Sequence, residues 1–138
     1  MVHALREAQR VLASGGALVD LRPLLDRWPL EVAWIGGFEE TGRAVDLQEP
    51  LADDAAANAA MAELEAPGRL TREWSASFDL FYYWDTPKEM EAYIADEWSD
   101  VIAVDASVWS SLRSRWSTAS SDARVRMRMK MLITRYRK

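Results

Sequence analysis

Two segments of the chain alternate between apolar and polar side chains over most of their length, and this pattern limits the possible folds more than any other feature. From Trp74 to Trp84 every even-numbered residue is apolar or aromatic, and from Val125 to Ile133 every odd-numbered residue is apolar. A period of two residues is typical of a β-strand with one buried face. The sequence therefore predicts two long strands, Thr71–Trp84 and Arg124–Arg137.

The polar faces of these two predicted strands carry opposite charges. Glu73 and Asp79 belong to the first face, and the second is basic. Antiparallel pairing would place the acidic side chains opposite the basic ones and the aromatic stripe beside the methionine stripe, which favours this pairing. A slip of one residue would move the whole apolar set into water, so the register is fixed. The residues of the basic face are Arg124, Arg126, Arg128 and Lys130.

The uneven distribution of charge raises the alternative of a nucleic-acid-binding tail. Residues 122–138 contain seven basic side chains and one acidic one, although the net charge of the chain is −5. Binding of nucleic acid requires arginines that are free on a surface, ideally with aromatic side chains between them. Because the predicted pairing uses these arginines and the rest of the chain repels phosphate, we expect no nucleic-acid partner.

The remaining elements follow from helical spacing and from short apolar runs between glycine or proline residues. We expect helices over 2–13, 55–65 and 107–117, and a further helix that begins at Pro87. Strands are expected over 17–22, where the run reads as buried, and over 30–36 and 43–47, while 101–104 fits either an extended piece or a helix entry. Asp53-Asp54 should precede the second helix and Pro67-Gly68 should close it. These elements predict one α+β domain over 1–138, with a mixed, largely antiparallel sheet and helices packed against it.

The composition excludes several kinds of chemistry. The chain has no cysteine and a single histidine, His3. Disulfides, thiolate zinc sites, cysteine nucleophiles and multi-histidine metal sites are therefore excluded within one chain. The acidic pairs Glu39-Glu40 and Asp53-Asp54 fit solvated turns and helix starts better than a metal site. No apolar run of membrane-spanning length and no secretory leader is present, so we expect no membrane partner and a cytoplasmic location.

The beginning of the chain combines an amphipathic helix, the turn Ser14-Gly15-Gly16 and a short strand from Ala17 that ends in Asp20-Leu21-Arg22-Pro23, with Arg10-Val11-Leu12 just before the glycines. This order resembles the helix before the fifth strand, and the fifth strand itself, of class I S-adenosylmethionine-dependent methyltransferases. The two long alternating segments follow in the same chain order and resemble the antiparallel hairpin formed by the last two strands of that family. The chain is therefore similar to the second half of a methyltransferase.

The resemblance implies that the cofactor-binding half is missing. The family binds its cofactor with a glycine-rich loop after the first strand and an acidic residue after the second, and neither has a counterpart here. No cofactor-binding or catalytic residue is carried over, and S-adenosylmethionine is expected only if a separate chain supplies the missing half. In the family the fifth strand lies beside the fourth, so residues 17–22 would expose an apolar edge. We expect a homodimer that covers this edge, or a sheet in which the hairpin over 30–47 occupies it.

Four residues are candidates for binding a substrate. Asp20 and Arg22 lie at the carboxyl end of the predicted strand over 17–22, where open α/β sheets place ligands. In the resembled family that end of the strand faces the substrate. The alternative for both residues is a structural role in local capping and ion pairing. Tyr83 and Trp84 belong to an aromatic run, and the Tyr83 side chain should point away from the apolar stripe, which favours a pocket. Core packing and a dimer interface are the alternative for both aromatic residues.

Three functional hypotheses follow from the sequence. The leading one is a non-catalytic, methyltransferase-derived protein that forms a dimer or docks onto a partner. The second is the substrate-recognition part of a split S-adenosylmethionine-dependent methyltransferase, inactive without a separate cofactor-binding chain. The third is a small-molecule binding module that uses an aromatic pocket.

Overall fold

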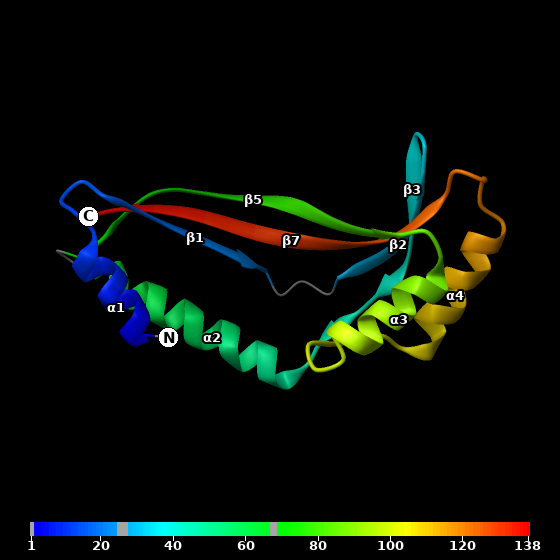
Figure 1. Cartoon of the computed structure of the whole chain (residues 1–138), viewed down its shortest axis with the longest axis horizontal. Coiled ribbons are helices and arrows are strands. Elements are labelled where there is room, and N and C mark those ends of the chain that lie inside the picture. The colour runs from blue at the N-terminus through cyan, green and yellow to red at the C-terminus, as the bar shows by residue number, and fades with distance from the viewer. Residues whose placement is uncertain (1, 25–27, 67–68) are drawn as a thin grey trace. The chain divides into compact units, whose positions relative to one another are not determined.

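The computed structural model describes residues 2–24, 28–66 and 69–138. These residues form an α+β structure with a mostly antiparallel sheet, as predicted (Figure 1). The described helices are α1 (Val2–Val11), α2 (Gln48–Leu64), α3 (Pro87–Glu97) and α4 (Ala106–Ser117). The described strands are β1 (Ala17–Pro23), β2 (Pro29–Trp34), β3 (Gly37–Arg43), β4 (Val45–Asp46), β5 (Thr71–Trp84), β6 (Ile102–Ala103) and β7 (Arg124–Arg137). None of the described helices has the length and apolar character needed to cross a bilayer.

The chain divides into two compact units, each described by itself. The described part of the first unit is residues 2–24, 49–66, 69–78 and 131–138, and that of the second is residues 28–48 and 79–130. Both long strands contribute residues to both units. Whether residues 1–138 act as one domain therefore stays a prediction.

The two long strands have the predicted bounds and pair with each other. Glu73, near the start of β5, forms ion pairs with Arg135 and Arg137, near the end of β7. Asp79, farther along β5, meets Arg128, which comes earlier in β7. The contacts therefore run in opposite directions along the two strands, which confirms the antiparallel pairing. Asp79 meets a residue of the predicted basic face, whereas the two partners of Glu73 lie outside that face.

In the first unit, α1 and α2 cover one face of a three-stranded arrangement in which β7 lies between β1 and β5. Tyr136 of β7 lies in the core between α2 and this face. Leu18, which is opposite Tyr136 in the β1–β7 register, packs against the same core. The other residues of this core are Leu5, Met61, Leu64 and Leu70.

The expectation that the strand over 17–22 is buried is wrong. Val19 and Leu21 are both 56% exposed, because they point to the face of β1 that the described helices do not cover. β1 is also a terminal strand of the sheet, whereas the hairpin of β2 and β3 pairs with β7. The alternative in which this hairpin covers the 17–22 edge is therefore not observed among the described residues.

In the second unit, β2 pairs with both β3 and the first part of β7, and α4 packs on the β2–β3 hairpin. Leu30 and Val32 of β2 lie opposite Met127 and Val125 of β7, and all four are fully buried. α3 begins at Pro87 as predicted, and its N-cap is Thr86, whose hydroxyl accepts a hydrogen bond from the Glu89 N–H.

The predicted strand over 43–47 is confirmed in part: it contains the end of β3 at Arg43 and the short strand β4, but the strand that completes the hairpin with β2 is β3. Gly36, with a φ of +90°, forms the turn, and the register shifts near Leu30. α2 begins at Gln48, seven residues earlier than expected, since proline is tolerated in a first helical turn. Asp53-Asp54 therefore lies inside this helix, and the predicted stop at Pro67-Gly68 lies outside the described residues.

The buried face of β7 changes along the strand. In the second unit the odd-numbered residues Val125, Met127 and Met129 are buried, whereas in the first unit the buried residues are the even-numbered Thr134 and Tyr136. The predicted apolar face through Ile133 is therefore correct only as far as Met129. The change falls near the boundary between the units.

Candidate ligand-binding cavity

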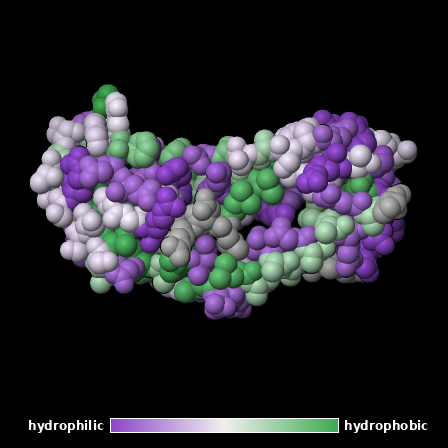
Figure 2. Space-filling model, turned by 180° about the vertical axis from the view of Figure 1, so that it is seen from behind, coloured by the Kyte–Doolittle hydropathy of each residue, from purple (hydrophilic) through white to green (hydrophobic). Residues whose placement is uncertain are grey.

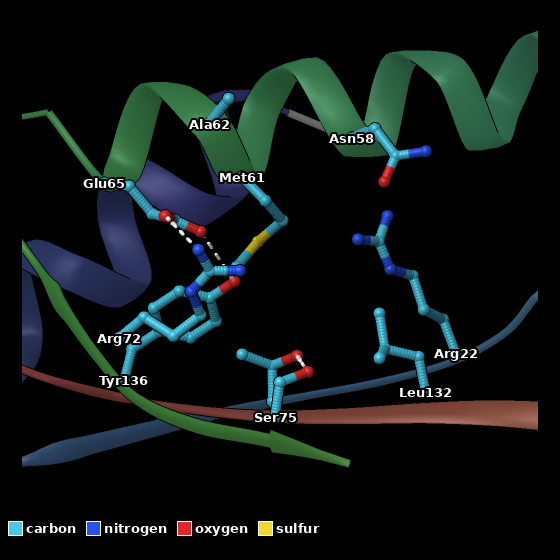
Figure 3. Close-up of a pocket in the computed structure, with 10 residues that line it drawn as sticks. Arg22, Asn58, Met61, Ala62, Glu65, Arg72, Ser75, Leu132 and Tyr136 are labelled. Carbon is cyan, nitrogen blue, oxygen red and sulfur yellow. Dashed lines mark hydrogen bonds and ion pairs between the residues drawn. The ribbon is translucent and has the colours of Figure 1, made fainter. Parts of the chain in front are cut away.

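A cavity of about 390 Å³ lies in the first unit, between α2 and the sheet (Figure 3). Its volume is at the lower end of the range of small-molecule sites. Four elements supply its lining, so the cavity depends on their packing and not on one contiguous motif. The lining residues are Arg22, Asn58, Met61, Ala62, Glu65, Arg72, Ser75, Leu132, Thr134 and Tyr136.

Regular geometry explains most of this lining. Arg22 of β1 is directly opposite Leu132 of β7, and such partners share one face of the sheet. On α2 and the residue that follows it, lining side chains recur every three or four positions, which places them on one face of the helix. On β5, Arg72 and Ser75 both line the cavity, although residues three apart in a regular strand point to opposite faces. The lining positions of β5 therefore do not follow a regular alternation.

Arg22 is the most unusual residue of the cavity. Its side chain is only 17% exposed, and its Nε atom lies 3.2 Å from Oδ2 of Asp20, while Nη1 lies 3.9 Å from Oδ1 of Asp54. Despite these charge contacts, Nε, Nη1 and the Asp20 Oδ2 atom are buried and have no hydrogen-bond partner among the described residues. A buried polar atom without a partner costs roughly 1–3 kcal/mol. The charge of Arg22 is therefore balanced, but its N–H donors are available to an acceptor.

The helix side of this end of the cavity is polar. Arg22 extends from β1 toward α2, on the side where Asn58 lies (Figure 3). The Asn58 amide nitrogen donates to Oδ2 of Asp54, 2.9 Å away. On the sheet side the hydroxyl oxygens of Ser75 and Thr134 are 2.9 Å apart and share a hydrogen bond. The helix side of the cavity therefore offers an amide, and the sheet side offers hydroxyl groups.

The other end of the cavity is built around Glu65. Its carboxylate lies 3.6 Å from Nη2 of Arg72 and accepts a hydrogen bond of 3.2 Å from the Tyr136 hydroxyl. Burial raises the pKa of Tyr136, and the neighbouring Glu65 carboxylate raises it further. Tyr136 therefore stays protonated and continues to donate to Glu65 at neutral pH.

Of the four predicted site residues, the structure brings Asp20 and Arg22 together, and only Arg22 lines this cavity. Tyr83 and Trp84 belong to the second unit. The Tyr83 hydroxyl lies 3.1 Å from Nη1 of Arg126, and the ring of Trp84 packs against Trp98 at a centroid distance of 6.3 Å. Their roles in binding a substrate stay predictions.

Most residues of the cavity were missed by reasoning from the sequence. Thr134 and Tyr136 lie beyond the point where the buried face of β7 changes, and Arg72 and Ser75 do not follow a regular alternation in β5. A signal was present in the three consecutive apolar residues 131–133, which cannot all lie on one face of a strand. The positions of Asn58 and Glu65 depend on how α2 packs, and nothing in the sequence predicted this.

The arrangement offers hydrogen bonds and charge rather than a reactive group. The Ser75 hydroxyl contacts another hydroxyl and not a general base. Within residues 2–24, 28–66 and 69–138, no group of three or more histidine, cysteine, aspartate or glutamate side chains is arranged to hold a metal ion. The cavity can therefore orient a polar molecule through the guanidinium, amide and hydroxyl groups that line it.

A scan against protein-family models, a search of curated proteins and a search of solved structures each find no match to this chain. The resemblance to a methyltransferase half therefore rests on the residues that suggested it. The geometry of the first unit is the basis for a proposal about function.

Proposed function

We propose that the chain is a non-catalytic binding domain that holds a small, polar carboxylate in the cavity of the first unit. The observation that carries this proposal is Arg22, a largely buried guanidinium that lines the cavity and has two N–H-bearing nitrogens without hydrogen-bond partners. Hydrogen bonds from a guanidinium to a carboxylate are among the strongest in proteins. A ligand oxygen at Nε or Nη1 would remove the cost of leaving these donors unpaired.

The charge around the cavity limits the class of ligand. Arg22 and Arg72 are balanced by the carboxylates of Asp20, Asp54 and Glu65. Because the carboxylates outnumber the guanidinium groups, a dianion such as phosphate is less favourable than a monoanion. Hydroxyl groups on the floor of the cavity suit a second polar group on the ligand, and apolar side chains suit a short hydrocarbon part. The apolar lining residues are Met61, Ala62 and Leu132.

Titration calorimetry with acetate, lactate and benzoate tests this proposal. We expect saturable binding of at least one of these acids, and at least a tenfold loss of affinity in Arg22→Met. Arg6→Met is the matched control, because Arg6 lies in the same unit but is exposed and forms its ion pair with Glu63, away from the cavity lining. Acetamide should bind at least tenfold more weakly than acetate. The proposal fails if none of the acids binds, if Arg22→Met binds as well as the unmodified protein, or if acetamide matches acetate.

We also propose that the chain is related to the second half of a class I methyltransferase and has no catalytic activity alone. The order of α1, the glycine turn and β1, followed by the antiparallel pair of β5 and β7, supports this relationship. Calorimetry with S-adenosylmethionine should give no binding to the isolated chain. Binding in the micromolar range would contradict a non-catalytic protein.

A second candidate is the substrate-recognition part of a split methyltransferase. It is favoured by the position of Arg22, which lies at the carboxyl end of β1 and lines the cavity, since the resemblance implies that this end faces the substrate. Coding sequence for a glycine-rich strand–loop–helix, directly upstream of Met1 in the same operon or reading frame, would support this candidate. Its absence there would favour the stand-alone binding domain.

We further propose that the protein works as a homodimer. The exposed apolar residues of β1, a terminal strand of the sheet, support this part of the proposal. In the space-filling view, residues coloured as hydrophobic are visible among the hydrophilic ones at the surface (Figure 2). The cytoplasmic location stays a prediction from the sequence.

A further inference from the structure

β1 has one free edge, and its hydrogen bonding shows which backbone groups lie there. The Lys138 N–H donates to the Gly16 carbonyl oxygen at 3.0 Å, so the Gly16 carbonyl faces the end of β7. Backbone groups alternate in direction along a strand, so the even-numbered residues of β1 bond to β7. The N–H and C=O groups of Ala17, Val19 and Leu21 therefore face the free edge. Pro23 falls on the same side, where proline is tolerated because no ladder partner is lost.

The edges of the sheet differ in how they are protected. Natural proteins place charged side chains, proline or bulges on free edges to prevent pairing with another chain. β3 carries Glu39, Glu40 and Arg43, and the outer part of β5 carries Glu73 and Asp79. Each of these edges therefore presents charged side chains.

β1 has no comparable charges on its exposed face. Its two charged side chains, Asp20 and Arg22, are turned toward the helix side and are largely buried. The exposed positions are held by Val19 and Leu21, and only Pro23 at the end of the strand opposes pairing. Of the three edges, β1 is the one whose exposed side chains include no charged residue.

We infer that β1 pairs antiparallel with β1 of a second copy, about a two-fold axis that passes through Leu21. In this register Leu21 lies opposite Leu21 of the partner subunit, and Val19 lies opposite Pro23 of the partner subunit. Asp20 then lies opposite Arg22 of the partner subunit, and the symmetry repeats this pair. This inference rests on the homodimer part of the proposed function, and it uses Arg22, which also lines the proposed ligand cavity.

Charge complementarity selects this register. Only odd-numbered residues present backbone groups to the free edge, so the two strands can shift against each other only in steps that keep odd residues facing odd ones. A two-fold axis at Asp20 would place the two aspartates opposite each other, and an axis at Arg22 would do the same for the two arginines. Unlike charges directly opposite each other are stabilising and like charges are destabilising. An axis at Val19 would place Asp20 opposite Leu18 of the partner subunit and gain no ion pair.

The chain contains no cysteine, so single cysteine variants report the register directly. In the inferred register, Leu21→Cys places two cysteines on the axis with Cα atoms about 5.5 Å apart, within the range that a disulfide spans. Under mild oxidation, Leu21→Cys should form a covalent dimer of twice 15.7 kDa on a non-reducing gel. The control variants Val19→Cys and Asp20→Cys should form at least tenfold less covalent dimer. More cross-linking of either control than of Leu21→Cys would overturn the inferred register.

Light scattering separates this inference from the proposed function. The unmodified protein should have twice the mass of the chain, and Leu21→Lys should be a monomer with an unchanged circular dichroism spectrum. Ile35→Lys, at an exposed position in the hairpin turn of the second unit, should remain a dimer. A monomeric unmodified protein would contradict the homodimer itself, whereas a dimer that persists in Leu21→Lys would contradict only the use of β1. Carboxylate binding has a separate calorimetric readout, so failure of this inference and failure of the ligand proposal can be told apart.

Discussion

β7 presents the same ion-pair arrangement twice, in two different environments. In the second unit Glu31 forms ion pairs with Arg126 at 2.6 Å and Arg128 at 3.0 Å, and its side chain is fully buried. In the first unit Glu73 forms ion pairs with Arg135 at 3.0 Å and Arg137 at 2.7 Å, and its side chain is 29% exposed. Each glutamate therefore joins two arginines that are two positions apart on the strand.

The difference between the two arrangements comes from what covers them. The guanidinium of Arg126 lies 4.6 Å from the ring centre of Phe38 and 4.4 Å from that of Phe81. These contacts exclude water and add cation–π attraction. The comparison teaches that the alternating sequence specifies which charges meet, whereas the neighbouring aromatic side chains decide how strongly stability depends on them.

The largest expected effect is that of Glu31→Gln. This change leaves Arg126 and Arg128 near a buried position without their shared counter-charge, and breaking a buried ion pair typically costs about 3–5 kcal/mol. Urea denaturation at pH 7 should show a loss of this size in the free energy of unfolding. A loss below about 1 kcal/mol would mean that water or another group compensates the arginines, and the contrast between the two sites would disappear.

The next effect tests the change of buried face along β7. Met127→Ala removes a fully buried side chain in the second unit and should cost about 2–5 kcal/mol. Met131 is also an odd-numbered residue of β7, but it lies in the first unit, where odd-numbered residues point away from the helices. Met131→Ala should therefore lower the free energy of unfolding by less than half as much. Equal losses in urea denaturation would contradict the change of face at the boundary between the units.

The smallest effect is expected for Glu73→Gln. The hydrogen bond from Arg137 lowers the pKa of Glu73, against a smaller opposing effect of burial, and the charge of Arg135 lowers it further. A carboxyl whose pKa is lowered in the folded state stabilises that state above its unfolded pKa, and this contribution is lost as the pH falls through the folded value. The protein should therefore be more stable than Glu73→Gln at pH 7, by less than the effect of Glu31→Gln.

Denaturation at decreasing pH provides the check on this prediction. The difference between the protein and Glu73→Gln should begin to shrink as the pH approaches the ordinary glutamate value of 4.5, and it should vanish below the lowered pKa. A difference that stays constant from pH 7 to pH 3 would show that the ion pair is not its cause.

The sequence predicted the elements whose pattern is local. The bounds of β5 and β7, their antiparallel pairing and the start of α3 at Pro87 followed from alternation, charge and proline placement. The strand β3 was missed because the pair Thr41-Gly42 is typical of an interruption between strands. In the structure, a side chain at Gly42 would begin 2.7 Å from the methyl groups of Val108 in α4, so the glycine allows close packing within the strand. Such a contact between distant residues cannot be found from the local pattern.

The candidate site was predicted only in part. Asp20 and Arg22 were found because they end a short apolar strand, and the structure brings the two side chains together. The rest of the cavity depends on the change of the buried face along β7, on the irregular lining positions Arg72 and Ser75 in β5, and on the packing of α2. These features arise from tertiary packing, and the aromatic residues that looked most suited to a pocket, Tyr83 and Trp84, contact arginine and tryptophan side chains instead.

Nitrogen-15 NMR of the arginine Nε–H groups during titration with lactate tests most directly whether Arg22 holds the ligand. The Arg22 signal is assigned by its loss in Arg22→Lys, and the exposed Arg6 serves as the reference. A saturable shift of the Arg22 Nε–H, with no change at Arg6, is the expected result. A titration in which Arg22 does not move, or moves only in parallel with Arg6, would contradict a binding site built on its unpaired donors.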